Sequence, residues 1–265
     1  MDLELTGRRA IVTGASRGIG LAVAHGLAAE GAHVALVARD PEVLSRAADA
    51  VRRHGTTVLP VPADTRDDGA VRGMVARVVA ELGGVDVLVN AAARPAVPGP
   101  VPPLAELSDD ALRDEVETKV LGYLRCARAV APHMVDAGWG RIINISGLGA
   151  RIAGSLVGSV RNVAVAAMTK NLADELGPAG ITVTVVHPGI TVTERLADVV
   201  ADRARREGRT PEEVGRALAA GTSIGRLVTA REVADVVTFL ASPRSAGITG
   251  DAVTVGGGTR GAIHY

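Results

Sequence analysis

The chain has 265 residues, which suits one large α/β domain or two small ones, and a hydrophobic content of 47% supports a substantial core. The formal net charge is zero and no basic block occurs, so nucleic acid and an anionic membrane surface are disfavoured as partners. Aromatic residues make up only 2% and Cys126 is the single cysteine, which implies an aliphatic core without a disulfide.

Short apolar runs rich in β-branched residues alternate with longer amphipathic runs. Strands are predicted at 8–14, 33–39, 56–64, 85–90, 141–146, 181–189 and 252–258. Helices are predicted at 19–31, 41–55, up to 81, from about 108 to 133, and from 210 and 229, where Asp40, Thr210 and Thr229 are N-caps. This alternation predicts a doubly wound parallel sheet of the Rossmann type in a single domain, 1–265. An excursion at about 190–228 is expected to lie over the ligand crevice.

A glycine-rich turn follows the first strand and opens the first helix, in the stretch TGASRGIG. Its glycines permit a tight turn and a close approach to a pyrophosphate, which the helix N-terminus attracts. The candidate cofactor-binding residues of this turn are Gly14, Ser16, Arg17, Gly18, Ile19 and Gly20. The strand, turn and helix context favours a bound dinucleotide over a glycine turn without a ligand.

The end of the second strand predicts which dinucleotide is bound. Ala38 stands where an acidic residue would pair with the ribose 2′-hydroxyl of NAD, and Arg39 follows it. A guanidinium there could bind a 2′-phosphate, and Arg17 adds positive charge nearby. We therefore expect NADP(H) to be preferred over NAD(H), the alternative being that both arginines are solvated surface charges.

Taken together, these segments resemble the short-chain dehydrogenase/reductase family over nearly the whole length. The resemblance is carried by TGASRGIG, PADTRD, Asn90 with the two alanines after it, GRIINIS, AMTKNLADELGPAGITVTVVHPG and GDAVTVGGG. It implies that the adenine end of the cofactor meets Asp64, Asn90 and Ala91. It also implies that Pro188, Gly189 and Thr193 close over the nicotinamide.

The same resemblance implies a catalytic Asn, a Ser and a Tyr-x-x-x-Lys pair, and all four positions differ here. Counting back from AMTKNL places Gly158 at the Tyr position and Asn162 at the Lys position. Counting forward from GRIINIS gives Val160 and Ala164 instead. The chain has two tyrosines, Tyr123 and Tyr265, so neither register restores the motif.

Two other positions are also changed. Gly147 stands at the Ser position beside Ser146, whose side chain would point to one face of the strand or the other depending on a one-residue slip. Lys119 stands at the Asn position, in VETKVLGYL. We therefore consider an exchange in which the long helix supplies the ammonium and Asn162 supplies the amide. Alternatively, Lys119 extends to solvent and the pairing is coincidental.

Three further side chains are candidates for the substrate side. Arg161 would bind an anion or polarise a carbonyl if it faces a cleft with Ser155, and otherwise it is a surface or subunit-contact residue. His187 is either an acid/base or a packed strand-end residue. Tyr123 is a displaced hydroxyl or is buried in the long helix. The catalytic candidates are thus Lys119, Ser146, Asn162, Arg161 and His187, and no metal site is predicted.

Three functions fit these residues. The first is an NADP(H)-dependent oxidoreductase acting on a small carbonyl or imine with a non-standard proton path. The second is a non-redox lyase, isomerase, epimerase or cyclase on the same scaffold, and the third is a catalytically silent paralogue that binds the dinucleotide. A cytoplasmic location is expected from the single cysteine and from the lack of a leader or membrane span. The resemblance implies a homodimer or homotetramer, in which the C-terminal tail reaches a neighbouring subunit.

Overall fold

A computed structural model describes residues 1–94 and 100–260. Its centre is a sheet of seven parallel strands in the order β3-β2-β1-β4-β5-β6-β9. These strands are β1 (Arg9–Thr13), β2 (His33–Ala38), β3 (Val58–Pro62), β4 (Val87–Asn90), β5 (Gly140–Ile145), β6 (Ile181–Pro188) and β9 (Ala252–Val255). Six of them lie within predicted runs, β5 begins one residue before its predicted run, and the doubly wound parallel sheet is confirmed.

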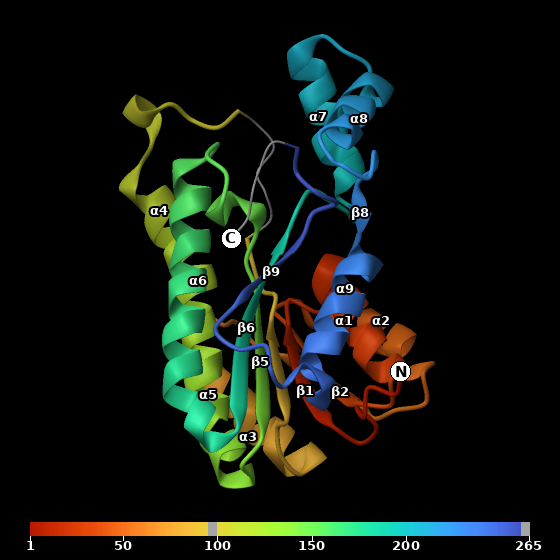
Figure 1. The fold of residues 1–265 in the computed structure, drawn as a ribbon, viewed down its shortest axis with the longest axis vertical. Helices are drawn as coiled ribbons and strands as arrows, with labels where there is room; N and C mark the ends of the chain where they lie inside the picture. The colour runs from red at the N-terminus through yellow and green to blue at the C-terminus, as the bar shows by residue number, and fades with distance from the viewer. Residues whose placement is uncertain (95–99, 261–265) are drawn as a thin grey trace.

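Helices cover both faces of the sheet (Figure 1). On one face lie α1 (Gly18–Ala29), α2 (Pro41–Arg52) and α9 (Ala230–Ala241). On the other lie α3 (Asp68–Leu82), α5 (Gly122–Ala137) and α6 (Leu156–Leu176). Successive strand residues point to opposite faces, so Ala10 and Val12 pack with the first layer and Ile11 with the second. This explains why the strands are apolar throughout.

The predicted helix starts are confirmed. Asp40 Oδ1 accepts hydrogen bonds from the backbone N–H groups of Glu42 and Val43 at 3.0 and 3.1 Å. Thr210 and Thr229 each form a capping box, at the starts of α8 (Pro211–Ala220) and α9. These caps satisfy backbone donors that the first helical turn leaves without a partner.

The predicted long helix is continuous but is not a regular α-helix. Between α4 (Asp109–Glu115) and α5, one wider π-helical turn runs over Val116–Leu121. Such turns are rare and occur frequently at functional sites. Lys119 lies within this turn, so the irregularity marks the helix at a candidate catalytic residue.

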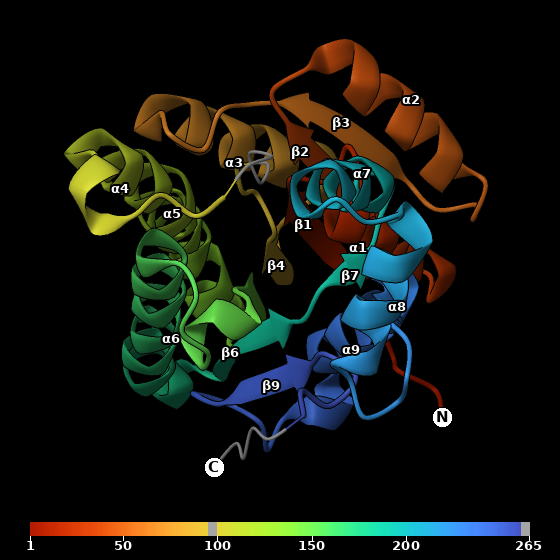
Figure 2. The ribbon, with the colours of Figure 1, turned by 90° about the horizontal axis from the view of Figure 1, so that it is seen from above.

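The excursion stands at the carboxyl ends of the strands. It contains α7 (Leu196–Glu207), α8 and the short paired strands β7 (Thr191–Val192) and β8 (Val228–Thr229). The view from above shows α7 and α8 on the side of α1 and α9, opposite α4 and α6 (Figure 2). The chain leaves β1 outward to β2 and β3 and returns to β4, so the switch point where such sheets bind ligands lies between β1 and β4.

The remaining short elements connect the main ones. Single turns of 3₁₀ helix occur at Leu104–Glu106, Leu148–Ala150, Gly177–Ala179 and Pro243–Ser245. None of the helices in the described ranges is both long and apolar enough to cross a lipid bilayer.

Candidate functional site

The turn after β1 has the backbone geometry that the glycines predicted. Gly14 and Gly18 have φ angles of +67° and +56°, in the left-handed region that favours glycine. A Cβ atom on Gly20 would stand 2.4 Å from the Gly14 carbonyl oxygen, so a side chain there would prevent this turn. The start of α1 carries no side-chain cap, because its N-cap residue Arg17 makes no such hydrogen bond. Its backbone donors are therefore available for an anion.

The ends of β1 and β4 are joined directly beneath this turn. Thr13 Oγ1 accepts hydrogen bonds from the backbone N–H groups of Ala91 and Ala92 at 3.1 and 3.2 Å. A Cβ on Gly14 would lie 2.7 Å from the Ala91 carbonyl oxygen. Asn90 itself is fully buried, and its Nδ2 donates to Asn144 Oδ1 at 3.0 Å. The Asn90 side chain therefore takes part in an internal network that supports the strand ends.

The other predicted cofactor residues follow strands: Arg39 follows β2, Asp64 lies just after β3, Gly189 follows β6 and Thr193 follows β7. Arg39 is exposed and makes no hydrogen bond or ion pair within the described residues, whereas Asp64 Oδ1 accepts from the Arg66 backbone N–H at 3.0 Å. The Thr193 methyl group would lie 3.7 Å from a Cβ on Gly18, so the start of the excursion packs over the glycine turn. A Cβ on Gly189, which follows the buried Pro188, would lie 2.8 Å from Gly256 Cα.

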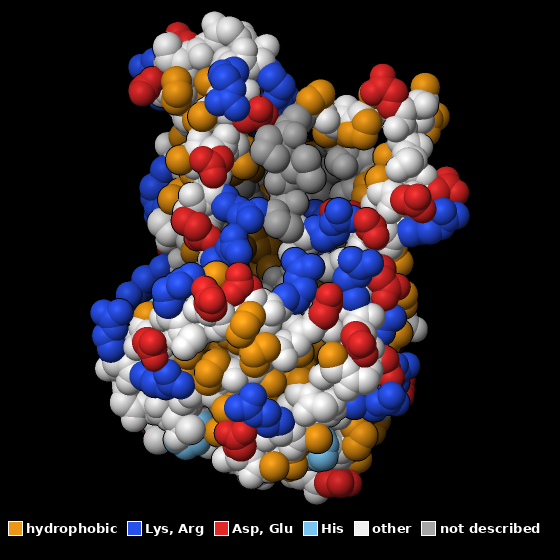
Figure 3. Space-filling view, turned by 180° about the vertical axis from the view of Figure 1, so that it is seen from behind, with side chains coloured by type: hydrophobic (Ala, Val, Ile, Leu, Met, Phe, Trp, Pro, Cys, Tyr) orange, Lys and Arg blue, Asp and Glu red, His pale blue; other side chains and the backbone are white. Residues whose placement is uncertain are grey.

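Viewed from behind, the molecular surface is hollowed between the projection that carries α7 and α8 and the one opposite (Figure 3). Lys and Arg side chains, with Asp and Glu side chains among them, stand along the lower rim of this hollow (Figure 3).

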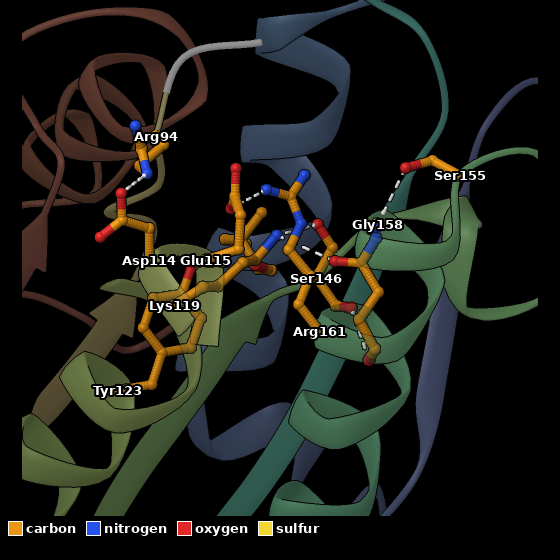
Figure 4. Close-up of polar contacts among 11 residues, drawn as sticks. Arg94, Asp114, Glu115, Lys119, Tyr123, Ser146, Ser155, Gly158 and Arg161 are labelled. Atoms are coloured by element: carbon orange, nitrogen blue, oxygen red, sulfur yellow. Dashed lines mark hydrogen bonds and ion pairs between the residues drawn. The ribbon is translucent and has the colours of Figure 1, made fainter. Parts of the chain in front are cut away.

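Lys119 and Asn162 meet between the π turn and α6. Lys119 Nζ donates to the Ser146 carbonyl oxygen at 2.8 Å and to Asn162 Oδ1 at 3.1 Å (Figure 4). Only 4% of Lys119 is exposed, so its side chain points inward and does not extend to solvent. The exchange considered from the sequence is thus accompanied by a direct contact between an ammonium from one helix and an amide from the other.

The surroundings of Asn162 fix its amide. The Ser146 hydroxyl donates to the Asn162 backbone carbonyl oxygen at 3.1 Å, so this side chain faces α6. Cβ atoms on Gly147 and Gly149 would lie 3.2 and 3.0 Å from Asn162 Nδ2. The loop after β5 therefore approaches Asn162 with backbone alone, which holds the amide oxygen toward Lys119.

No side chain occupies position 158, one turn before Asn162. Helix α6 begins at Leu156, and its N-cap Ser155 accepts a hydrogen bond from the Gly158 backbone N–H at 3.1 Å (Figure 4). Ser155 thus lies near Gly158 as a cap and not as a residue of the helical face. A Cβ on Gly158 would lie 3.2 Å from Ser155 Oγ.

Arg161 forms an ion pair with Glu115, the last residue of α4 (Figure 4). The two side chains are 23% and 19% exposed, and Arg161 Nε is buried without a partner within the described residues. The sequence did not indicate Glu115. Its position four residues before Lys119 is the signal that could have identified it, because residues at that spacing share one side of a helix.

The pKa of Lys119 is unusually low for a lysine. Burial, and to a smaller extent the nearby positive charge of Arg161, lower its pKa to about 7, while Glu115 acts in the opposite direction. An amine with this pKa exchanges its proton near neutral pH, as a general acid or base must. The two remaining candidates are less suited to proton transfer with a substrate. Tyr123 is buried and donates to the Ile145 carbonyl oxygen at 3.0 Å, and His187 is buried in β6. Tyr265 lies outside the described residues.

The lowered pKa of Lys119 predicts a pH-dependent stability. An unfolded lysine keeps its proton up to about pH 10.4, so above pH 7 the unfolded state binds more protons than the folded state. The free energy of unfolding should then rise by about 1.4 kcal/mol per pH unit between about pH 7 and 8.5. Above that range Cys126, whose pKa burial raises to about 12, ionises only in the unfolded chain and offsets the rise.

Urea unfolding of the wild type and of Lys119→Met across this pH range measures the effect. The free energy of unfolding of the wild type minus that of the variant should increase with pH up to about 8.5, because the variant lacks the buried amine. Parallel curves would show that Lys119 keeps its proton in the folded protein.

Comparison with known proteins places this geometry in a family. The family model described as enoyl-(acyl carrier protein) reductase matches residues 14–260. The short-chain reductase protein NovJ of Streptomyces niveus is 37% identical over 252 residues, which cover 94% of this chain and 92% of NovJ.

Solved structures agree with this assignment. L-sorbose reductase from Gluconobacter frateurii, in complex with NADPH and L-sorbose, superposes with a TM-score of 0.91 at 31% identity, covering 99% of this chain and 100% of that chain. An NAD⁺-bound xylitol dehydrogenase superposes with a TM-score of 0.87 at 27% identity, covering 96% of this chain and 100% of that chain. With the parallel sheet, the glycine turn and these similarities together, the chain belongs to the short-chain dehydrogenase/reductase family of oxidoreductases.

Proposed function

We propose that this protein is an NADP(H)-dependent oxidoreductase that acts on a small carbonyl or imine substrate and uses Lys119 where its relatives use a Tyr-x-x-x-Lys pair. The observation that carries the proposal is the buried Lys119 ammonium held by the Ser146 carbonyl oxygen and the Asn162 amide. Neither register of the motif, Gly158 with Asn162 or Val160 with Ala164, offers a side chain that could transfer a proton at neutral pH.

The residues around the first turn fit a dinucleotide. Side chains at Gly14 and Gly20 would clash with the backbone of Ala91 and of Gly14, so the tight turn depends on glycine, and α1 offers uncapped backbone donors there. Thr193 packs over Gly18 from the excursion, which supports closure above the nicotinamide. Bound NADPH would supply the hydride, and the remaining requirements on the protein are to orient the substrate and move one proton.

Lys119 is suited to that proton transfer. An ammonium has three N–H donors, and two of them are used by the Ser146 carbonyl oxygen and Asn162 Oδ1. Within the described residues no further acceptor meets Nζ, so the third donor can face a substrate oxygen or nitrogen. In the reductive direction the ammonium gives this proton to the product, and in the oxidative direction the neutral amine accepts it.

NADP(H) preference is part of the proposal. Two observations support it: Ala38 carries no carboxylate that would repel a phosphate, and the exposed Arg39 guanidinium has no partner among the residues that the structure describes. NADPH binds to the sorbose reductase and NAD⁺ to the xylitol dehydrogenase compared above, so both cofactors occur on this fold.

The function is tested by adding members of a panel of small ketones, aldehydes and imines to the protein with NADPH and measuring the loss of NADPH absorbance. We expect turnover with NADPH for members of the panel, and Arg39→Ala should raise the KM for NADPH about 10- to 100-fold while leaving that for NADH unchanged. Arg46→Ala, at an exposed arginine of α2, is the matched control. A panel that consumes no NADPH would contradict the oxidoreductase, and an unchanged KM in Arg39→Ala would contradict the preference.

Self-association is a further part of the proposed function. Val160 and Val163 on α6 are 44% and 49% exposed, which leaves apolar surface on one of the two long helices. A second copy of the chain would bury these side chains, in keeping with the homodimer or homotetramer expected from the family resemblance.

A further inference from the structure

A second polar link joins the two helices that the Lys119–Asn162 hydrogen bond connects. Glu115 precedes Lys119 by four residues, and Arg161 is the chain neighbour of Asn162. Their ion pair therefore runs beside the hydrogen bond between Lys119 Nζ and Asn162 Oδ1 (Figure 4). Glu115 and Lys119 are close in the sequence, and Arg161 and Asn162 are adjacent. The ion pair and the hydrogen bond therefore hold the charge pair and the buried ammonium in one fixed arrangement.

The charges of this pair act on Lys119 in opposite directions. The guanidinium of Arg161 repels a proton on Lys119, and the carboxylate of Glu115 attracts it. Less than a quarter of either side chain is exposed, so solvent screens these effects less than it screens a surface pair. The strength of each effect depends on the other partner, because the ion pair fixes where both charges stand.

Other charged groups near Lys119 have partners of their own. On the π turn Glu117 pairs with Arg125 of α5 at 2.7 Å, and on α4 Asp114 pairs with Arg94. Strand β5 presents only the uncharged Ser146 carbonyl oxygen to Nζ. On α5, burial raises the pKa of Tyr123, which therefore stays neutral.

We propose that Glu115 and Arg161 are positioning residues that determine, in the reaction proposed above, the pH at which Lys119 gives up its proton. Neither residue contacts Lys119 Nζ through a hydrogen bond. Each acts through its charge, and through the link that keeps the π turn against α6. The inference rests on the proposed role of Lys119.

The chain offers an unusually clean test, because it contains only two lysines, Lys119 and Lys170. Lys170 is exposed and pairs with Asp174 on its own helix, so Lys170→Arg leaves a single lysine and keeps that ion pair. In this background, lysine labelled with ¹³C at Cε gives one signal, and its chemical shift against pH reports the titration midpoint of Lys119 directly.

Three variants in this background are compared with their parent. Glu115→Gln leaves Arg161 without its counter-ion and should lower the midpoint by about one pH unit. Arg161→Met leaves the carboxylate beside Lys119 and should raise the midpoint by about one pH unit. The double variant carries neither charge and should titrate between the two single variants. Midpoints that do not move, or that move in the same direction in both single variants, would overturn the inference.

Arg161→Met leaves a half-buried carboxylate unpaired, so it is the variant most exposed to misfolding. If it does not fold, Glu115→Gln and the double variant still decide the question, because their midpoints must differ if Arg161 acts on Lys119. Circular dichroism confirms that each titrated sample is folded.

The pH dependence of kcat/KM separates this inference from the proposed function. Reduction should decline at a lower pH in Glu115→Gln and at a higher pH in Arg161→Met, in step with the NMR midpoints. A pH profile that stays fixed while the midpoints move would overturn the inference and leave the oxidoreductase intact. Moving midpoints without any NADPH turnover in the wild type would instead overturn the oxidoreductase and support the electrostatic control of Lys119.

Discussion

Lys119→Met is expected to lower kcat/KM for NADPH-dependent reduction by about 10²- to 10⁴-fold, the range associated with the loss of a general acid. Methionine fills much of the same volume but has no proton to give, and it cannot bond the Ser146 carbonyl oxygen or Asn162 Oδ1. Because Tyr123 is neutral, buried and already bonded to the Ile145 carbonyl oxygen, it cannot replace the amine without moving.

Steady-state kinetics at pH 6.5 measures this loss, and Lys170→Met is the matched control. That second lysine is exposed on α6, and its replacement should leave kcat/KM unchanged. Asn162→Ala should also impair reduction, because it removes one of the two acceptors that orient Nζ. Unimpaired activity in both Lys119→Met and Asn162→Ala would show that neither residue serves the reaction.

Asn162→Lys is expected to destabilise the fold by about 3–5 kcal/mol, the cost typical of an uncompensated buried charge. It replaces the acceptor of Lys119 by a second cation, and the Ser146 carbonyl oxygen alone cannot satisfy both ammonium groups. The exchange variant Lys119→Asn/Asn162→Lys should recover part of this loss, because an ammonium and an amide again face each other from opposite helices.

Urea unfolding of the wild type, both single variants and the exchange variant forms a complete double-mutant cycle. We expect a coupling energy of about 1–3 kcal/mol in favour of the exchange, as for residues in direct contact. Single-variant effects that simply add would mean that Lys119 and Asn162 do not interact energetically, whatever their distance.

Most of the fold could be predicted from the sequence because its signals are local. Continuous β-branched runs identify strands buried on both faces, and the glycine turn and the caps at Asp40, Thr210 and Thr229 fix where helices begin. The π turn at Val116–Leu121 could not be predicted, because hydrophobic periodicity does not resolve one widened turn within a long helix.

The candidate site could likewise be predicted only in part. The motifs on either side gave two registers, with Asn162 or Ala164 at the Lys position, so the exchange with Lys119 was one alternative among those considered. In the structure it is Asn162 that contacts Lys119. The face to which the Ser146 side chain points could not be predicted, because a one-residue slip at a strand end turns a side chain to the opposite face. The pairing of Glu115 with Arg161 depends on how two helices pack, which no sequence spacing specifies.

A crystal structure with NADPH bound tests the central claim most directly, namely that Lys119 stands at the reacting end of a dinucleotide. The account predicts the pyrophosphate at the first turn of α1, and Lys119 Nζ within about 2.6–3.2 Å of the nicotinamide ribose or of a substrate atom above the hydride-carrying carbon. A cofactor bound elsewhere, or a tyrosine hydroxyl in that position with Lys119 sealed off from it, would contradict the account.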